Sequence, residues 1–345
     1  MNASLPSRIG AFALLAVAAL GLPATAGATD GVQSVAVPAE GRAVDASHPS
    51  RVVGRGTPAS CTSRAVVAAV RAGGVIRFDC GPQPVVIHMA QTARVVNRSL
   101  RVVLDGGGLV TLSGDRRRRI LYMNTCDPKQ VWTTSHCQDQ STPQLVVQNL
   151  TFADGNSTGE KRRPGRRRRD LRAGRAGRIV NATFLRNRCD ATGPDMGGGA
   201  VRVLSQYRNQ PVYVVGSRFS GGVCSNGAAL SSIGVSWVVL NSRFTGNRAI
   251  GSGANPQRAG TPGGGSGGGI YNDGNTFTLR IAGTLMQDNH ANEGGGAIFY
   301  VSNDRSGTLA IDRSTLRRNP SEGFRTLPGI FFLGAKRTIT RSVVR

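Results

Sequence analysis

The sequence contains few aromatic residues: Trp, Tyr and Phe together make up 5% of the chain. Glycine, in contrast, accounts for 47 of the 345 residues. So few large apolar side chains are poor material for a conventional helical or α/β core. Glycine-rich turns between many short runs of Val, Ile and Leu are instead typical of an all-β repeat protein.

Acidic residues are also scarce, since 19 Asp and Glu stand against 43 Lys and Arg, for a formal net charge of +24. Such a basic balance can indicate nucleic-acid binding. Much of the positive charge, however, lies in two short runs, Arg116–Arg119 and Lys161–Arg178, and the aromatic platforms of a single-strand binder are missing around them. We therefore expect no specific nucleic-acid partner, and instead an acidic polysaccharide or a cell-envelope surface.

Long apolar runs are absent apart from one at the N-terminus. There, the basic stretch of residues 1–8 precedes an uncharged apolar run, Ile9–Leu22, and small residues follow at 24–28. This arrangement predicts a signal peptide over residues 1–28. The apolar run is shorter than the roughly 20 residues that a membrane span needs. We therefore expect a secreted protein, extracellular or at the cell surface, with no transmembrane span.

After the predicted cleavage site the chain divides into two parts. Residues 29–60 are rich in Ala, Val, Pro, Ser and Gly with little periodicity, which predicts a flexible leader. Residues 61–345 are expected to form one domain. The six cysteines include no CxxC pair, so a zinc site is not indicated, and an even number in an exported chain predicts three disulfides.

Two phrases recur along this domain. One is a β-branched run that ends in Phe or Leu and is followed shortly by Asn, with end residues at 152, 184, 219, 244, 285 and 316. The other is a glycine cluster that leads into an apolar strand, at 197–201, 267–271 and 294–299. The end residues are 25 to 41 residues apart, about the length of a coil of three short strands and three turns.

This repetition predicts an all-β fold: a single-stranded right-handed parallel β-helix with three strands per coil. Residues 62–72 are expected to form a short helix that caps the open N-terminal coil, with Thr62 or Ser63 as its N-cap. The longest interval contains the glycine-rich insert Ser252–Ser266, which we place in a surface loop. An antiparallel β-sandwich is the alternative, but it predicts hairpin turns and no long-range phase.

The two phrases resemble the GGA[IVL] and FxxN signatures of polymorphic outer-membrane-protein repeats, within the pectin-lyase-like β-helix superfamily. The resemblance covers roughly residues 100–345, and the repetition makes it more specific than any single copy of either phrase.

The cysteine positions agree with this register. Cys189 lies five residues after Phe184, and Cys224 lies five residues after Phe219, so stacked coils bring the two cysteines together. Neighbouring strands are about 4.8 Å apart, which suits the Cα separation of a disulfide. Other pairings of the six are possible in principle. The remaining candidates flank the predicted helix or close a short loop: Cys61 with Cys80, and Cys126 with Cys137.

Signatures of known catalytic sites are missing. The NTD, DD, GHG and RIK motifs of polygalacturonases on this fold do not occur, and no GxSxG or HExxH motif precedes a suitable helix. Residues 162–167 match the RxPxxR context of pectate lyases, but they lie inside an arginine run, where such a string arises by chance. We assign no catalytic residue. The histidines are scattered and none pairs with a recognisable nucleophile: His48, His88, His136 and His290.

One polar constellation stands out. The pairs Asn272-Asp273 and Asn303-Asp304 lie at the same offsets before Leu285 and Leu316. If those leucines stack, the carboxylates of Asp273 and Asp304 lie close together and need a shared proton or a cation. Asn272, Asp273, Asn303 and Asp304 are therefore candidate ligand-binding residues, for a weak calcium site or for the hydroxyl groups of a sugar. The alternative is that both pairs form ordinary turns.

Two functions follow from these observations. We favour a secreted or cell-surface β-helix repeat protein that is non-catalytic and binds glycan or the cell-envelope surface. The alternative is a polysaccharide lyase or glycoside hydrolase that acts on an acidic polysaccharide. Apart from the weak calcium site, the sequence indicates no metal or other cofactor, and it does not define the oligomeric state.

The arginine run at 161–178 leads to a prediction about the gene. The spacing of the repeats predicts a glycine cluster and a strand in this run. Residues 166–171, Arg-Arg-Arg-Arg-Asp-Leu, can be encoded by CGG-CGG-CGG-CGC-GAT-CTT, followed by a codon that begins with C. Displaced by one base, these codons read Gly-Gly-Gly-Ala-Ile-Phe, the phrase of the other coils. We expect the gene sequence to show a frame-shifted repeat. If the displaced frame does not encode a glycine-rich strand, the run is a genuine polyanion-binding loop instead.

Overall fold

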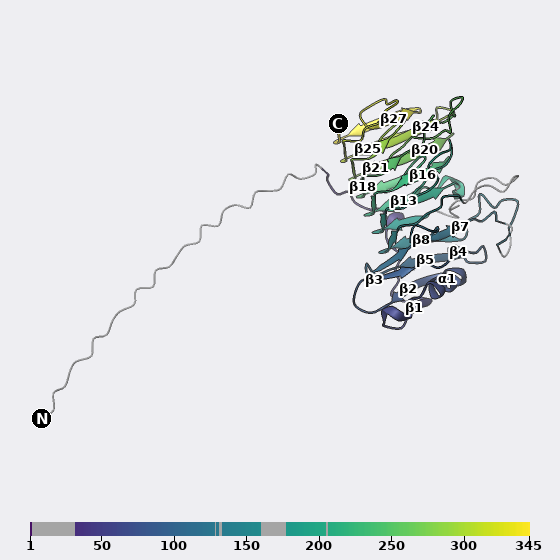
Figure 1. Cartoon of the computed structure of the whole chain (residues 1–345), viewed down its shortest axis with the longest axis vertical. Helices are drawn as coiled ribbons and strands as arrows, with labels where there is room; N and C mark the ends of the chain where they lie inside the picture. The colour runs from purple at the N-terminus through teal and green to yellow at the C-terminus, as the bar shows by residue number, and fades with distance from the viewer. Residues whose placement is uncertain (2–31, 128, 131–132, 160–176, 205) are drawn as a thin grey trace.

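The computed structural model describes residues 1, 32–127, 129–130, 133–159, 177–204 and 206–345. The predicted signal peptide and almost all of the arginine run therefore lie outside the described residues. In the described part the chain stacks short strands into an elongated pile (Figure 1).

All pairings between the strands are parallel, and strands that follow one another in sequence usually belong to different sheets. The ten-stranded sheet is, in order, β1 (Arg51–Gly54), β2 (Gly74–Asp79), β5 (Arg101–Asp105), β8 (Gln144–Gln148), β10 (Arg178–Val180), β13 (Val212–Val215), β17 (Trp237–Leu240), β21 (Thr278–Ala282), β25 (Thr308–Asp312) and β28 (Lys336–Thr340). The nine-stranded sheet is β3 (Val85–His88), β6 (Val110–Ser113), β9 (Thr151–Ala153), β11 (Thr183–Leu185), β14 (Arg218–Ser220), β18 (Arg243–Thr245), β22 (Leu285–Gln287), β26 (Thr315–Arg317) and β29 (Val343–Val344).

The structure also contains three smaller parallel sheets. The five-stranded sheet is β12 (Val201–Val203), β16 (Leu230–Ile233), β20 (Ile270–Gly274), β24 (Ile298–Ser302) and β27 (Ile330–Leu333). The three-stranded sheet is β15 (Val223–Cys224), β19 (Arg248–Ala249) and β23 (His290–Ala291), and the two-stranded sheet is β4 (Ala93–Val95) and β7 (Leu121–Met123). From β12 to β26 the chain visits the five-, ten-, nine- and three-stranded sheets in a fixed cycle. After β26 it passes directly to β27 of the five-stranded sheet, without a strand in the three-stranded sheet. The predicted parallel, all-β repeat is confirmed.

The core consists of like residues stacked from coil to coil. The rings of Phe152, Phe184, Phe219 and Phe244 lie parallel, with centroids 5.1, 4.8 and 4.7 Å apart. The next inward residue is Met286, which pairs with Phe244 on one side and Leu316 on the other. The prediction that Leu285 occupies this position is therefore wrong by one residue. Leu285 and Met286 are both apolar, so hydrophobicity alone does not distinguish which of them faces inward.

Polar side chains of the turns also form ladders inside the stack. The amide of Asn247 donates to Asn289 Oδ1 at 2.8 Å, and that of Asn289 donates to Asn319 Oδ1 at 2.9 Å. All three side chains are buried. The asparagines thus form a ladder that pairs buried polar groups, which would otherwise cost free energy.

The predicted short helix is α1 (Ser63–Ala72). Its N-cap is Thr62, whose hydroxyl accepts a hydrogen bond from the backbone of Ala65 at 3.2 Å, and it ends at Gly73 with a φ of 73°. The helix lies beside β1 and β4, at the N-terminal end of the pile (Figure 1). Its face with Val66 and Val70 is buried in the core.

Part of the region expected to be a flexible leader is instead packed on the sheet. Strand β1, within residues 29–60, pairs along its whole length with β2. Before it, Val35 and Val44 are hydrogen-bonded to side chains of the ten-stranded sheet. The composition of this segment gave no periodic signal because its contacts are made by a few valines and by backbone groups. The remaining short helices are η1 (Ala39–Gly41), η2 (Pro58–Ser60) and η3 (Tyr207–Asn209).

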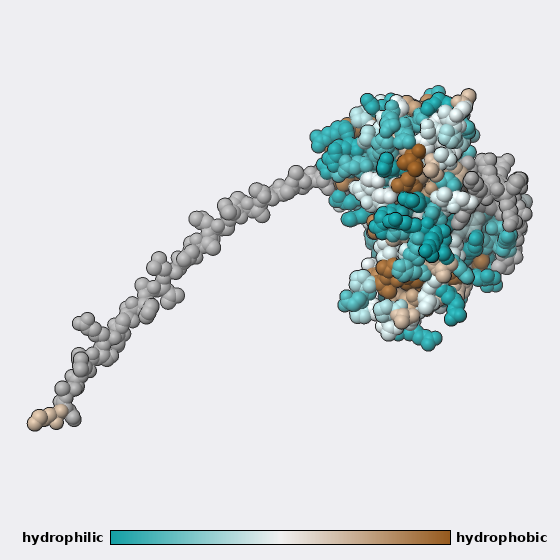
Figure 2. All heavy atoms as spheres, in the orientation of Figure 1, coloured by the Kyte–Doolittle hydropathy of each residue, from teal (hydrophilic) through white to brown (hydrophobic). Residues whose placement is uncertain are grey.

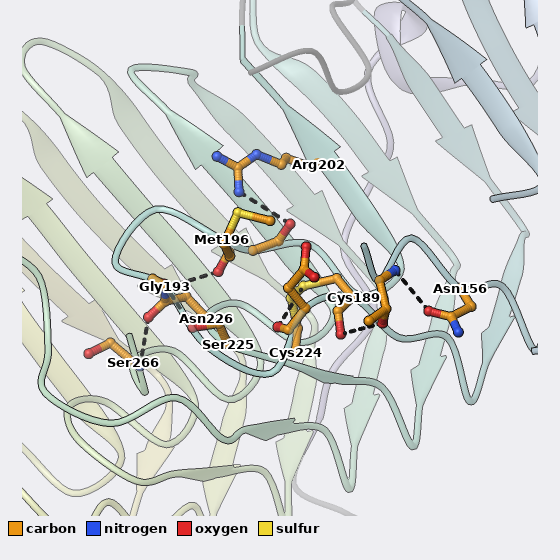
Figure 3. Close-up of a disulfide and its surroundings, with 12 residues drawn as sticks. Asn156, Cys189, Gly193, Met196, Arg202, Cys224, Ser225, Asn226 and Ser266 are labelled. Carbon is orange, nitrogen blue, oxygen red and sulfur yellow. Dashed lines mark hydrogen bonds between the residues drawn. A yellow bond between two sulfur atoms is a disulfide. The ribbon is translucent and has the colours of Figure 1, made fainter. Parts of the chain in front are cut away.

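The three disulfides have the expected pairing. They join Cys61 to Cys80, Cys126 to Cys137 and Cys189 to Cys224, with Cα atoms 5.6, 5.0 and 4.8 Å apart. Around the third disulfide, the Asn226 amide donates to the carbonyls of Gly193 and Met196 and so holds the preceding loop in place (Figure 3). The 4.8 Å separation is that of neighbouring strands, so Cys189 and Cys224 lie at the same phase of adjacent coils.

One coil of the stack contains a partly open apolar cavity. The coil that contains β8 and β9 lies between the coil of β7 and the coil of β12. The described residues of this intermediate coil form no strand between β7 and β12. A cavity of about 110 Å³ lies there, lined by residues that include Leu121, Met123, Phe152, Val201 and Val203. Its position is the one where the displaced reading frame would supply an Ala-Ile-Phe strand.

Filling this cavity should stabilise the protein. The variant R166G/R167G/R168G/R169A/D170I/L171F carries the displaced-frame phrase, and we expect its melting temperature to rise by roughly 3 °C or more, because apolar side chains would occupy the cavity. The matched control R166G/R167G/R168G/R169A/D170S/L171S removes the same charges without adding apolar side chains. Calorimetry distinguishes them, and equal melting temperatures for the two variants would contradict the prediction.

Candidate functional site

The structure separates the two Asn-Asp pairs. Asn272 and Asp273 belong to β20, and in the register of the five-stranded sheet Asp273 pairs with Val301. Asp304 lies three residues beyond Val301, in the turn after β24. The predicted stacking of Asp273 on Asp304 is therefore wrong.

The reason is a longer turn in the later coil. Paired residues differ by 28 in number between β20 and β24 but by 30 between β21 and β25, so the turn after β24 contains two extra residues. Counting back from Leu285 and Leu316 hides this insertion, and Leu285 is itself one residue away from the inward position.

Two of the four candidates have structural partners of their own. Asn272 is fully buried and accepts a hydrogen bond from the Ser232 hydroxyl at 2.5 Å. Asp304 is exposed and accepts from the Ser302 hydroxyl at 2.8 Å and from the backbone of Ser306 at 3.1 Å. The Ser306 contacts are the main cause that lowers the pKa of Asp304 to about 2. In the described structure Asp304 thus forms a turn of the kind that the sequence also allowed.

The other two candidates, Asp273 and Asn303, are in contact. The Asn303 amide donates to Asp273 Oδ1 at 3.2 Å, while Tyr271 and Asn255 both donate to Asp273 Oδ2 at 3.0 Å. Burial raises the pKa of the Asp273 carboxyl. Since Asn255 belongs to the Ser252–Ser266 insert, Asp273 holds that surface loop against the outer face of the five-stranded sheet. A second attachment is the forked pair of Arg258 with Glu293, at 2.8 and 2.6 Å.

The outer faces of the three large sheets differ in what covers them. Valines of the ten-stranded sheet lie under residues 35–46, and the Tyr271–Phe299 stack of the five-stranded sheet lies under the insert. The nine-stranded sheet presents a polar face in two columns of residues that alternate with the inward phenylalanines. The polar members of one column are Thr111, Thr151, Thr183, Arg218 and Arg243, and this column continues into the buried Leu285 and Thr315. The polar members of the other column are His88, Ser113, Ser220, Thr245, Gln287 and Arg317, with Ala153 and Leu185 between Ser113 and Ser220.

This polar face is positively charged. Arg218 and Arg243 are exposed and are direct neighbours in the register of β14 and β18, and none of the nine strands contains an acidic residue. In the view of Figure 2 the molecular surface is mainly hydrophilic, with small and separate hydrophobic patches. Neighbouring guanidinium groups on a flat polar sheet are suited to hold carboxylate or sulfate groups.

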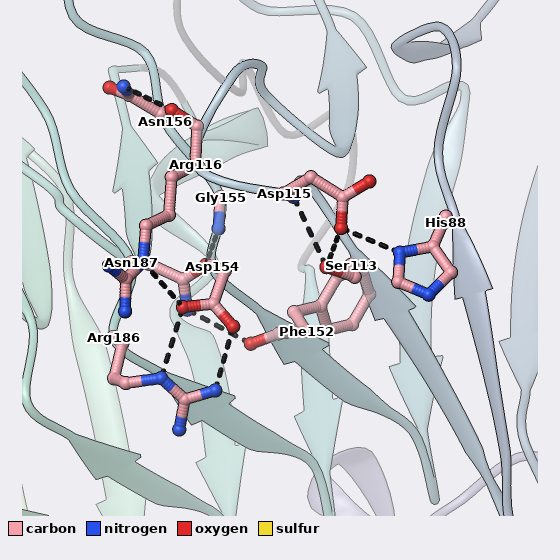
Figure 4. Close-up of polar contacts among 10 residues, drawn as sticks. All are labelled: His88, Ser113, Asp115, Arg116, Phe152, Asp154, Gly155, Asn156, Arg186 and Asn187. Carbon is pink, nitrogen blue, oxygen red and sulfur yellow. Dashed lines mark hydrogen bonds and ion pairs between the residues drawn. The ribbon is translucent and has the colours of Figure 1, made fainter.

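Acidic side chains lie at the corner that follows these strands, where they are paired. Arg186 donates to Asp154 at 3.0 and 2.7 Å, and Arg318 donates to Asp288 at 2.7 and 3.0 Å (Figure 4 shows the first pair). These arginines lower the pKa of the Asp154 and Asp288 carboxyls. Neither pair was predicted from the sequence, although each partner lies two residues after the inward Phe, Met or Leu of its coil.

At the N-terminal end of the same corner, Asp115 accepts hydrogen bonds from two residues. His88 Nδ1 lies 2.7 Å from Asp115 Oδ1, and the Ser113 hydroxyl donates to the same oxygen at 2.7 Å (Figure 4). These bonds lower the pKa of Asp115. The serine contacts the aspartate and not the histidine, so the three residues do not form a serine nucleophile with its base. The arrangement instead fixes the exposed His88 ring beside the polar face.

Comparison of the chain with protein-family models, with curated proteins and with solved structures found no match. Among the described residues, no three His, Cys, Asp or Glu side chains are placed to hold a metal ion together. No helix in the described ranges is long and apolar enough to cross a membrane.

The two aspartates should respond oppositely to amidation. At pH 7, D304N should lower the melting temperature, because the amide replaces a carboxylate that accepts hydrogen bonds in its charged form; D273N should leave it unchanged or raise it by roughly 1–2 °C, because burial disfavours the charged form.

The pH dependence supplies the check. The folded pKa of Asp304 is lowered, so its stabilisation is present above the unfolded pKa and disappears as the pH falls from about 4 toward about 2. The folded pKa of Asp273 is raised, so wild type should gain stability relative to D273N as the pH falls through that value. Parallel melting curves for the two variants from pH 7 to pH 2 would contradict these assignments.

Proposed function

We propose that the chain is a secreted or cell-surface β-helix protein that binds an acidic polysaccharide along the outer face of its nine-stranded sheet and does no chemistry on it. The fold we propose is the right-handed β-helix of the pectin-lyase-like superfamily, with three main strands per coil and repeats of the polymorphic outer-membrane-protein type. Helix α1 would serve as its N-terminal cap. The recurring phrases, the three disulfides and the apolar N-terminal run support this assignment.

The observation that carries the binding proposal is the adjacent pair Arg218 and Arg243. Their strands are direct neighbours, so their backbones are separated by about 4.8 Å. An extended acidic polysaccharide repeats its carboxylates along its length, and a chain lying parallel to the stack can place successive groups on successive coils. The Thr and Ser hydroxyls of the same two columns are suitable partners for sugar hydroxyl groups.

The alternative function is a lyase or glycoside hydrolase, and His88 is the observation that favours it. Its ring is held by Asp115 at the edge of the polar face, where an imidazole can take up a proton. A glycosidase would in addition need two carboxyl groups about 5–9.5 Å apart across the bound sugar. Incubation with the polysaccharide followed by measurement of new chain ends separates this alternative from binding alone.

Removing the two arginines should weaken binding. We expect R218A/R243A to bind polygalacturonate at least roughly tenfold more weakly than wild type at 0.15 M salt, because two charge-assisted contacts are lost. The matched control is R101A/R280A, which removes two exposed arginines from the ten-stranded sheet. Titration calorimetry measures both, with neutral dextran as a second ligand.

Three results would contradict the proposal. The first is wild-type protein that does not bind the acidic polymer, and the second is an equal loss in the control variant, which would indicate net charge rather than a site. The third is equal binding of dextran. Unchanged melting temperatures of both variants show that the comparison concerns binding and not folding.

A further inference from the structure

Residues 33–48 lie along the outer face of the ten-stranded sheet, and their side chains alternate. Val35, Val37 and Val44 are half-buried against the sheet, whereas Ser34 and Ala36 are exposed. On either side of the single turn η1 (Ala39–Gly41), this period of two is that of an extended chain with one face on a surface.

Two carboxamide side chains, Gln148 on β8 and Asn241 directly after β17, bind the backbone of this segment. Asn241 accepts from the Val35 N–H at 2.9 Å and donates to the Val35 carbonyl at 2.8 Å. Gln148 does the same for Val44, with both distances 2.8 Å. Each carboxamide therefore satisfies both polar groups of one residue, as a neighbouring β-strand would. Gln148 is almost fully buried, so these bonds are largely shielded from water.

Apolar side chains of the sheet receive the valines. Val35 and Val37 pack against Val180, Val215 and Leu240, which stack outward on β10, β13 and β17. Val44 and Ala46 pack in the same way on valines of β2, β5 and β8, namely Val75, Val103 and Val146. Without the segment, this apolar column would face solvent.

The segment crosses the strands rather than joining the sheet. Its contacts reach from Ala282 on β21 to Val75 on β2, and these are the ends of a run of seven adjacent strands. Six steps of about 4.8 Å amount to roughly 29 Å, and the chain from Val35 to Ala46 can span about 36 Å when it is extended. The segment, which contains the turn η1, thus runs along the axis of the stack.

We propose that the outer face of the ten-stranded sheet is a binding surface for an extended valine-rich peptide, and that residues 33–48 of the same chain are its ligand. In a solenoid each coil contacts only its neighbours, so coils can separate one at a time. A bound segment that touches coils from β2 to β21 couples them directly. It also passes the coil with the apolar cavity, because β8 and β10 lie within its span.

Complementation in trans tests this surface. In the chain that begins at residue 29, deletion of residues 33–48 should lower the melting temperature by roughly 4 °C or more, because the apolar column and the carboxamides lose their partner. A synthetic peptide of residues 33–48 should restore it in a saturable manner. The same peptide with V35D, V37D and V44D is the control and should have no effect.

A second variant keeps the test decisive if the deletion does not fold. Asn241 has a φ of 52° and Asn181 has a φ of 49° at equivalent corners of the same sheet, where other coils carry Gly216 and Gly283. N241G and N181G therefore both remove an asparagine without backbone strain, but only N241G removes contacts with the segment.

Trypsin cleavage after Arg42 reports release of the segment. We expect N241G to be cleaved there roughly tenfold faster than wild type, and N181G at the wild-type rate, because cleavage requires the segment to leave the sheet. Equal cleavage rates in N241G and N181G would overturn the proposal. So would a deletion variant that folds with an unchanged melting temperature and does not respond to the peptide.

Discussion

Parallel stacking in register is the constraint on which the rest of the structure depends. Each residue lies about 4.8 Å above its counterpart in the previous coil. A position in the stack is therefore stable when the side chains at that position in adjacent coils interact favourably with one another. Phenylalanine rings meet this condition by stacking, and asparagines meet it by donating to one another. The bridge between Cys189 and Cys224 meets it covalently.

A charged side chain interacts favourably with its counterpart in the adjacent coil only when the two charges have opposite signs. At the corner after the nine-stranded sheet, an aspartate in one coil is followed by an arginine in the next, as in Asp154 with Arg186. Within the sheet itself, Arg218 stacks on Arg243, and no strand there supplies an acidic residue. The proposed polysaccharide site is thus the place where two residues of like charge are neighbours within the strands.

The spacing of the repeated phrases predicts the parallel fold and the disulfide pairing, because stacking places chemically similar residues at the same position in successive coils. It does not carry the register where coils differ in length: the two extra residues after β24 separate Asp273 from Asp304, and adjacent apolar residues leave Leu285 and Met286 indistinguishable. Contacts that do not repeat from coil to coil cannot be predicted from this spacing. The segment with Val35 and Val44 is held by single carboxamides from distant coils, and nothing local in its sequence records them.

The lengths of the connections then decide which face of the stack is open. Only Asn241 and Ser242 lie between β17 and β18, and such a turn has no residues to spare for covering the nine-stranded sheet. Between β19 and β20 the chain instead runs from Ile250 to Gly269, and Asn255 and Arg258 fix this loop over the five-stranded sheet. The outward valines of the ten-stranded sheet are covered by residues 35–46. The connections from the ten-stranded into the nine-stranded sheet are two to five residues long, so within the described residues these turns supply no cover for the outward Thr, Ser and Arg side chains of the nine-stranded sheet.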